Sequence, residues 1–569
     1  MTTVSPTVPV RQGAAHISTT ALRLAGPGEP DHLDPVCVAQ PASAQLARLS
    51  TRSLFGYVGD PDPLSWRPVT PMADLAATVP SIYNAGIGAS HRSIVVTLRP
   101  GVRWDTTPPR AVTAHDVVRG LKRLGNPVYR PAALPYFTSM IRGMAEFCAG
   151  YVAAVPDPNP SAAQLAAYQN EYDIAGVFAL DDETVVFELT RPALDLPHLL
   201  ALPCAAPAPV EYDAFVPGSP ALRSHLHSTG PYRPVATESG EQLRWEPNPA
   251  WRAETDPLRS RYLSGVELTT GPGSPRELAQ RISAGEIDLA WGIAVTGPSG
   301  GEPTHDPAWA MDPYLLLNTR SPHASAAVRD VVVRRAIASA IDHRVRTALA
   351  EIAVAAEPGW LARVATSLIP PGNDGHRSEH PPLGATVDRP GARAEGREEP
   401  LATGAGPDVD GALILVHPRT GIAGSVARVC AEALARAGIA VRCVELADAE
   451  HRRVLRDAHR ERWDIAVASR HPEWSQLGGR VFVQPLAEGC PAAGPPIARA
   501  LDAVAEPARA VVAWREAEQR ILDNAAVVPL LFRAPCAPPL VNERIHGILT
   551  LPSLAHQVDL TALQLDPSV

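Results

Sequence analysis

The stretch that decides the fold runs from Tyr314 to Asp342 and reads YLLLNTRSPHASAAVRDVVVRRAIASAID. It opens with an apolar run of a length that suits a buried strand and is too short for a helix. Polar residues and Pro322 interrupt this run, and from Asp330 onward apolar residues recur with helical spacing. The recurring residues are Val333, Ile337 and Ile341. The stretch therefore predicts a buried strand, a polar turn and an amphipathic helix that Asp330 caps.

A second stretch, Leu98 to Leu124, reads LRPGVRWDTTPPRAVTAHDVVRGLKRL and predicts another helix with a defined start. Thr113 and Asp116 have the spacing of a capping box, in which each side chain accepts a hydrogen bond from the other residue's N–H group. The expected apolar face of this helix consists of Val117, Leu121 and Leu124. Apolar residues alternate just before the helix, at Ile94, Val96 and Leu98, and predict a strand.

Both stretches resemble hallmark passages of the family 5 solute-binding proteins, the dipeptide-, oligopeptide- and nickel-binding components of ABC importers. Six further passages resemble that family in the same order along the chain. They are residues 21–35 (ALRLAGPGEPDHLDP), 176–192 (GVFALDDETVVFELTRP), 228–251, 265–292, 425–446 and 513–534 (AWREAEQRILDNAAVVPLLFRA). Each passage alone is a sequence pattern common in α/β proteins. The series of passages in this order, over roughly residues 22–550, is specific to the family.

The resemblance implies an α/β fold of the periplasmic-binding-protein-like class, with two lobes around a cleft and an extra inserted domain, three domains in all. Domain I is expected to combine residues 22–55, 181–295 and 530–569, and domain II, the inserted lobe, residues 56–180. Domain III is expected to comprise residues 296–529. Within it, residues 371–412 are rich in Pro, Gly, Arg and Glu and predict a loose loop.

The family resemblance also directs attention to Arg470. In the peptide-binding members, an aspartate of a domain III segment holds the α-amino group of the ligand. The matching segment here is IAVASRHPEWSQL, where Arg470 replaces the aspartate, and no other aspartate lies between Asp464 and Asp502. We therefore expect that ordinary peptides are not held by their N-terminus, and that Arg470 suits a carboxylate, phosphate or sulfonate. The alternative is that Arg470 is a solvated loop residue.

Five other residues are candidates for the cleft because of their positions in the passages that resemble the family. They are Trp474, Asn318, Thr319, Trp291 and Tyr232. Aromatic side chains in such a cleft would supply contact area without strong directionality. For each of the five, the alternative is packing within a lobe.

The composition argues against several classes of protein. The net charge of −9 and the pI near 6.1 do not fit a nucleic-acid-binding surface. No stretch approaches the ~18 consecutive apolar residues of a membrane span. The seven cysteines contain no CxxC pair, and His225 and His227 stand two apart without a supporting acid or cysteine. We expect no metal, no cofactor and no catalytic residues, and either buried free thiols or one or two disulfides.

The first 26 residues contain no apolar core of the length a signal peptide needs, and residues 1–21 are expected to form a disordered leader. The family implies an extracytoplasmic location, while a cytoplasmic one stays open. The expected function is capture of a small solute, peptide-like or anionic, by a monomer that delivers it to ABC permease subunits. The alternative is a cytoplasmic protein of the same fold repurposed as an enzyme or carrier in specialised metabolism.

Overall fold

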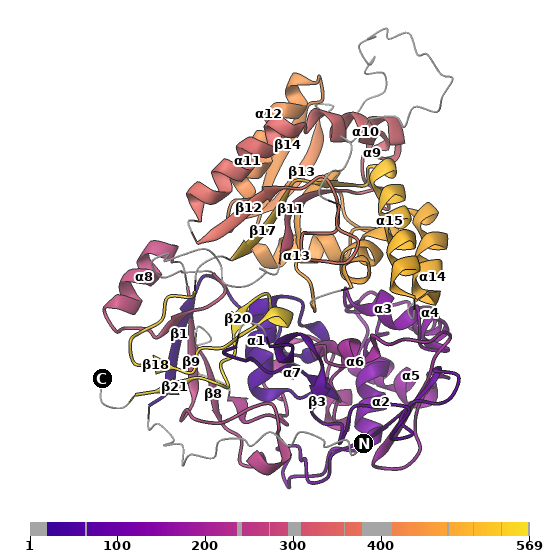
Figure 1. Ribbon diagram of the computed structural model, residues 1–569, viewed down its shortest axis with the longest axis vertical. Coiled ribbons are helices and arrows are strands. Elements are labelled where there is room, and N and C mark those ends of the chain that lie inside the picture. Colours follow the sequence, from indigo (N-terminus) through magenta and orange to yellow (C-terminus); the bar gives the residue numbers. More distant parts are fainter. Residues whose placement is uncertain are drawn as a thin grey trace, which may run out of the picture.

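The structure of the protein is a computed structural model. It describes residues 20–62, 65–235, 242–271, 273–293, 309–357, 359–377, 412–474, 477–503, 506–535 and 538–566. Two bodies are visible in Figure 1, one built around a five-stranded sheet with a smaller lobe beside it, the other around a seven-stranded sheet. This is the expected α/β architecture of two lobes with an inserted domain.

Domain I is organised around the five-stranded sheet, with strand order β10-β1-β9-β8-β7. Its strands are β1 (Leu22–Gly26), β7 (Tyr232–Val235), β8 (Gln242–Pro247), β9 (Val266–Thr270) and β10 (Leu289–Ala290). Strand β1 is parallel to β9 and β10, while β7, β8 and β9 are antiparallel neighbours. Helix α1 (Pro41–Ser50) packs on the face that carries Leu22 and Leu24, and α8 (Pro275–Ser283) packs against Ala25 on the other.

The inserted lobe has a three-stranded sheet and four helices. Strands β4 (Ser93–Thr97), β6 (Thr184–Glu188) and β5 (Val177–Ala179) pair in that order. The helices are α2 (Ala114–Arg123), α3 (Leu134–Thr138), α4 (Met144–Ala154) and α5 (Ala162–Glu171). The predicted capping box of α2 is confirmed: Thr113 and Asp116 accept each other's N–H groups, and the predicted apolar face is buried.

Domain III is built on the seven-stranded sheet, with order β12-β17-β11-β15-β13-β14 and β16 paired to β11. Its strands are β11 (Ala310–Leu317), β12 (Trp360–Val364), β13 (Leu413–Pro418), β14 (Val441–Leu446), β15 (Ile465–Arg470), β16 (Val527–Pro529) and β17 (Leu531–Pro535). Helices α10 (Val331–Ala340), α11 (His343–Ala356) and α12 (Ala423–Arg436) share one core with the sheet. Helices α13 (Asp448–Arg456), α14 (Gly494–Asp502) and α15 (Pro507–Asn524) contribute to the other cores.

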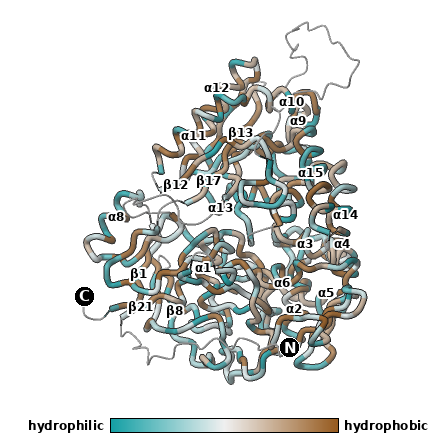
Figure 2. Tube along the Cα trace, viewed as in Figure 1, coloured by the Kyte–Doolittle hydropathy of each residue, from teal (hydrophilic) through white to brown (hydrophobic). Residues whose placement is uncertain are grey.

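Apolar and hydrophilic residues alternate along α11 and α12 in Figure 2, as expected of helices with one face on a sheet and one in solvent. The remaining short elements are α6 (Leu196–Leu199), α7 (Pro220–Arg223), α9 (Ala326–Arg329), β2 (Phe55–Gly56), β3 (Met72–Ala73), β18 (Ile545–His546), β19 (Thr550–Leu551), β20 (Gln557–Val558) and β21 (Gln564–Leu565).

The stretch from Tyr314 to Asp342 folds as a strand, a turn and a helix, with Asp330 capping α10 through the N–H of Val332. The helix also buries a charged residue beside its apolar stripe, Arg334, which is only 5% exposed. Its guanidinium donates hydrogen bonds to the main-chain carbonyl groups of Val328, Arg329 and Asn524. These bonds meet the hydrogen-bonding needs of the buried charge.

Strand pairing moves two of the expected domain boundaries. Strand β6 lies beyond the boundary expected at residue 180, yet it pairs with β4 and β5 of the inserted lobe. Strand β17 lies beyond the boundary expected at residue 530, yet it pairs with β11 and β12 of domain III. The chain returns to domain I near Val541, where Asn542 donates its N–H to Asp288. Most of the predicted leader and of the predicted loop 371–412 lies outside the described residues.

Candidate functional site

Domain III meets the other body along a contact that we call the seam. On one side are residues 470–474, which begin at the end of β15, and residues 477–484; we call them the seam segment. On the other side are α3 of the inserted lobe and α6 with its N-cap residue Asp195. In Figure 1, α3 lies next to α14 at this border. Two of the predicted site residues, Arg470 and Trp474, lie in the seam.

Arg470 is held by contacts within the protein. Its Nε donates to the carbonyl of Val481 at 2.8 Å, and its Nη2 donates both to the Tyr136 hydroxyl and to Glu473 Oε1 at 2.6 Å. The Tyr136 hydroxyl donates in turn to Glu473 Oε2 at 3.2 Å. Burial opposes the charge of the Arg470 guanidinium, but the Glu473 carboxylate and the Tyr136 and Tyr314 hydroxyl groups together outweigh it and raise the pKa of Arg470 above the ordinary value. Arg470, predicted as a ligand-binding residue with a solvated loop residue as the alternative, is largely buried in an ion pair, and an anionic ligand would have to compete with Glu473.

Trp474 is completely buried in an aromatic cluster that joins the two bodies. Its ring lies 5.3 Å from the Tyr136 ring in an edge-on arrangement and 5.7 Å from the His198 ring in a near-parallel one. Both geometries are among the favourable arrangements of aromatic pairs. The Nε1–H of Trp474 is buried without a hydrogen-bond partner in the described residues.

Arg480 forms the central polar contact of the seam, in a single π-helical turn (Gly479–Val483). Its Nε donates to Asp195 Oδ2 at 2.8 Å, and both side chains are almost fully buried. The same guanidinium donates to Ser139 Oγ at 3.2 Å and to the Tyr136 carbonyl at 3.3 Å. Its Cζ also lies 5.2 Å from the centre of the Tyr136 ring, in a cation–π arrangement.

His198 extends the seam into domain I. Its Nδ1 shares a hydrogen bond of 2.7 Å with the Tyr57 hydroxyl. Burial lowers the pKa of His198 to about 4, against a smaller opposing effect of Asp195. The imidazole is therefore neutral at neutral pH, and the seam closes without an unpaired histidine charge.

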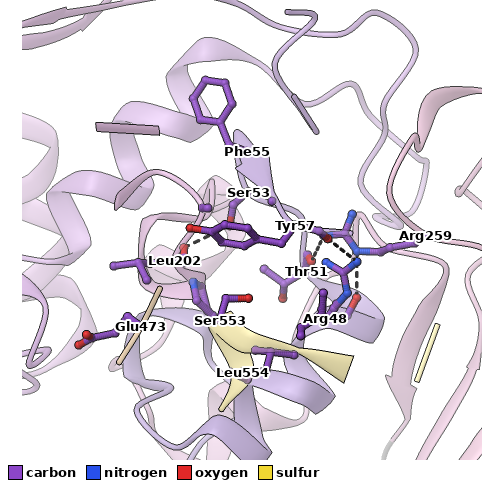
Figure 3. A pocket seen from close by; sticks show the side chains of 16 residues that line it. Arg48, Thr51, Ser53, Phe55, Tyr57, Leu202, Arg259, Glu473, Ser553 and Leu554 are labelled. Carbon is purple, nitrogen blue, oxygen red and sulfur yellow. Dashed lines mark hydrogen bonds between the residues drawn. The ribbon is translucent and has the colours of Figure 1, made fainter. Parts of the chain in front are cut away.

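A small cavity of about 60 Å³ adjoins the seam (Figure 3). Its walls are mostly apolar side chains from α1, from residues 53–57, from residues 201–203 and from residues 551–554, and Glu473 is the one lining residue from domain III. The hydroxyl of Ser53 donates to the Leu202 carbonyl, and the guanidinium groups of Arg48 and Arg259 are paired with aspartates. This space is large enough to hold a few water molecules.

Asn318 and Thr319 lie at the end of β11, away from the seam contacts just described. Asn318 is 2% exposed, donates to the Ala458 carbonyl at 3.0 Å and accepts the N–H groups that follow it in the turn. Thr319 is half-buried, and its Oγ1 would lie 3.0 Å from a Cβ placed on Gly489. These contacts are those of a turn that packs within domain III.

Trp291 and Tyr232 belong to the core of domain I. Tyr232 is fully buried, and its hydroxyl exchanges hydrogen bonds of 3.2 Å with the main chain of Leu263. Trp291 is 4% exposed and donates its Nε1–H to the Ala42 carbonyl at 3.1 Å. Both polar groups are satisfied inside the lobe, which favours a packing role for the two side chains.

Among the described residues, no group of three or more His, Cys, Asp and Glu side chains is arranged to hold a metal ion. Six cysteines fall in those residues and all six are free thiols; Cys536 lies outside them. Burial raises the pKa of Cys204 and of Cys430 to about 12, so both are packed as neutral groups.

The family model for bacterial extracellular solute-binding proteins, family 5, middle part, matches residues 85–478, well over half of the chain. The chain belongs to family 5 of the bacterial extracellular solute-binding proteins. No curated protein matches the sequence at a significant level.

Solved structures share the fold of this family 5 protein. OppA of Burkholderia pseudomallei is 16% identical with a TM-score of 0.70, and 96% of this chain and 100% of that chain are covered. The Escherichia coli murein tripeptide binding protein MppA is 17% identical with a TM-score of 0.69, covering 96% and 99%. "Clavulanic acid biosynthesis oligopeptide binding protein 2" is 23% identical with a TM-score of 0.63, covering 96% and 95%. At these identities the likeness concerns the fold alone.

Sequence reasoning missed four residues of the seam of this family 5 protein: Tyr136, Asp195, His198 and Arg480. Their contacts join positions up to 344 residues apart, and no local pattern encodes such pairing. Arg480 alone had a usable signal, because it follows Gly478 and Gly479 directly after the segment in which the family motif is altered.

No helix in the part of the chain that the structure describes combines the length and the apolar character needed to cross a membrane.

Proposed function

We propose that this family 5 protein captures a peptide-like solute between its lobes and delivers it to the permease subunits of an ABC importer. The observation that carries the proposal is the family match over residues 85–478, together with a fold shared over nearly the whole chain. OppA of Haemophilus influenzae was solved in complex with the peptide RPPGFSPFR and OppA of Listeria monocytogenes was solved bound to peptide. We further propose that the protein acts outside the cytoplasm, as a monomer and without catalysis.

The ligand mode that we propose departs from the peptide-binding members at one point. Arg470 stands where those members carry the aspartate for the α-amino group, and Arg470 is paired with Glu473 and Tyr136. A ligand amine would meet the Arg470 cation at this position. We therefore propose that the α-amino group of the peptide is not bound here. The same pairing weakens the anionic alternative, because Glu473 already neutralises the guanidinium.

The alternative of a carrier in specialised metabolism has one supporting observation, the name of a similarly folded protein, "Clavulanic acid biosynthesis oligopeptide binding protein 2". That name describes the other protein. Both the importer and the carrier hypotheses require a bound solute, and they differ in the partner that receives it.

Native mass spectrometry of the protein purified from its own host tests the ligand class directly. The proposal predicts an additional mass in the range of a short peptide, released on denaturation and fragmenting into amino-acid residues. A stoichiometric non-peptide anion instead would contradict the peptide-like assignment and return Arg470 to the list of ligand-binding candidates.

A further inference from the structure

The inserted lobe contacts domain III through several independent polar contacts. Gln484 donates to the Pro135 carbonyl at 3.2 Å, and Arg480 donates to Ser139 and to the Tyr136 carbonyl. Farther along the same border, Arg191 Nη1 lies 3.0 Å from Asp502 Oδ1 and donates to the Ala498 carbonyl at 3.2 Å. The inserted lobe is therefore in contact with the lobe that must move when the cleft opens.

The Arg480–Asp195 pair joins domain III to α6 beside the inserted lobe, and it is a deeply buried contact of the seam. The two side chains are 3% and 7% exposed, and their N–O distance is 2.8 Å. Asp195 stands at the N-cap of α6 but makes no capping hydrogen bond, so its carboxylate is available for Arg480. Separation of the lobes would return both charges to water, whereas removal of one partner in the closed protein leaves a buried charge alone.

Tyr136 connects this pair to the segment in which the family motif is altered. Its hydroxyl binds both Arg470 and Glu473, its ring contacts Trp474, and its carbonyl accepts from Arg480. The side chain that stands at the position of the ligand-anchoring aspartate is thus engaged with the inserted lobe. The Nε and Nη2 groups of Arg470 are already engaged with Val481, Tyr136 and Glu473.

We propose that the seam is a closing joint in which α3 of the inserted lobe and the neighbouring α6 together hold domain III, with Arg480–Asp195 as its central contact and Arg470 as a positioning residue. In this joint the inserted lobe contributes to the stability of the closed protein. Position 470, which in the peptide-binding members holds the ligand, here contributes to closure. Any effect of the joint on ligand affinity rests on the proposed function, whereas the contacts of the joint can be tested without a ligand.

Hydrogen exchange followed by mass spectrometry tests the joint in the full chain without added solute. Arg480→Met and Asp195→Leu each remove one partner. The expected result is an increase of about tenfold or more in exchange of peptides covering Leu134–Thr138 and Gly479–Val483, with unchanged exchange in β1. The double variant replaces the buried pair by two apolar side chains, and it should restore exchange to within about threefold of wild type.

Arg499→Met is the matched control, since Arg499 pairs with Glu516 on the exposed surface of domain III. It should leave exchange at the seam unchanged. Wild-type exchange at the seam in both single variants would overturn the joint, and so would a double variant no better protected than the single ones. Faster exchange in β1 would show that a single variant unfolds. In that case the exchange of the double variant at the seam still tests the joint. Failure of solute binding would appear in native mass spectrometry and leave these exchange results unaffected.

Discussion

At Gly479 the chain passes so close to α15 that an added Cβ would lie 2.1 Å from Cγ of Trp514. The three nearest atoms all belong to the Trp514 ring, and Trp514 is itself buried. A π-helical turn is rare in proteins, and here it presents Arg480 to Asp195 while its neighbour packs against Trp514. The absence of a side chain at 479 is thus required for the position of Arg480.

Gly479→Ala should therefore destabilise the protein by about 1–3 kcal/mol, because the ring of Trp514 or the π-helical turn must shift. Thermal or urea unfolding measures this loss. Gly494→Ala is the matched control: Gly494 begins α14, and nothing lies within 4 Å of a Cβ placed there. The control should be neutral or slightly stabilising. Equal stability of the two variants would contradict the packing described for Gly479.

The candidate site shows at residue scale what the sequence could not provide. Trp474 and Arg470 were chosen from an altered motif, and they lie in the seam. Tyr232, Trp291 and Asn318 were chosen by position alone, and their polar groups are satisfied within a single lobe. Position in a motif does not distinguish a cleft residue from one that stabilises the strand or turn beside it.

The observed secondary structure elements agree with the predicted ones where a capping residue or a regular spacing of apolar residues defined them. Helix α2 begins at its predicted capping box, and α10 begins after Asp330. The prediction failed where an element changed sheets, since β6 and β17 pair with strands of a domain other than the one expected. Pairing partners depend on contacts between distant segments, and alternation within a strand does not reveal them.

Helix α6 carries one titrating group of the seam, His198, and His471 of the seam segment is a second histidine whose pKa burial lowers. His198 faces the Tyr57 hydroxyl and the Trp474 ring, with Asp195 at the N-cap of its own helix. Its pKa is lowered to about 4, from an ordinary value of about 6.5. The neutral form is therefore favoured in the closed protein, and protonation costs more there than in the open or unfolded chain. The contribution of neutral His198 to the stability of the seam is fully present above about pH 6.5 and is lost as the pH falls toward 4.

His198→Asn should reduce this loss, because an asparagine oxygen can accept from Tyr57 but does not titrate. The contribution of His198 to the free energy of unfolding between neutral pH and pH 4 is at most roughly 3 kcal/mol. Melting temperatures of the two proteins across this range measure it. The variant should show the shallower decline below pH 6.5, and parallel declines would contradict a titrating role for His198.

At the scale of the whole molecule, the ordered series of passages was sufficient to predict the α/β fold, and the family model confirms it. The arrangement of one body against the other was not predictable in the same way. The contacts of Arg480 and Gln484 with residues 135–139 and 195 depend on how complete domains dock, and a single sequence carries no direct signal for docking. The seam thus became visible only in three dimensions.

The two bodies also explain how a solute could be enclosed. A peptide-like solute held between two lobes is enclosed when the lobes separate and then close around it by a hinge motion. Closure would then combine contacts to the solute with the contacts of the seam itself. A solute that binds only the folded protein raises its melting temperature in proportion to the free energy of binding.

The most direct measurement is therefore the melting temperature of the protein with three matched mixtures: random tripeptides, the same tripeptides acetylated at the N-terminus, and the free amino acids. Capture of a peptide-like solute without an anchor at Arg470 predicts similar increases with both peptide mixtures and none with the amino acids. An increase with the unblocked peptides alone would contradict the role assigned to Arg470. No increase with either peptide mixture would contradict the capture of peptide-like solutes.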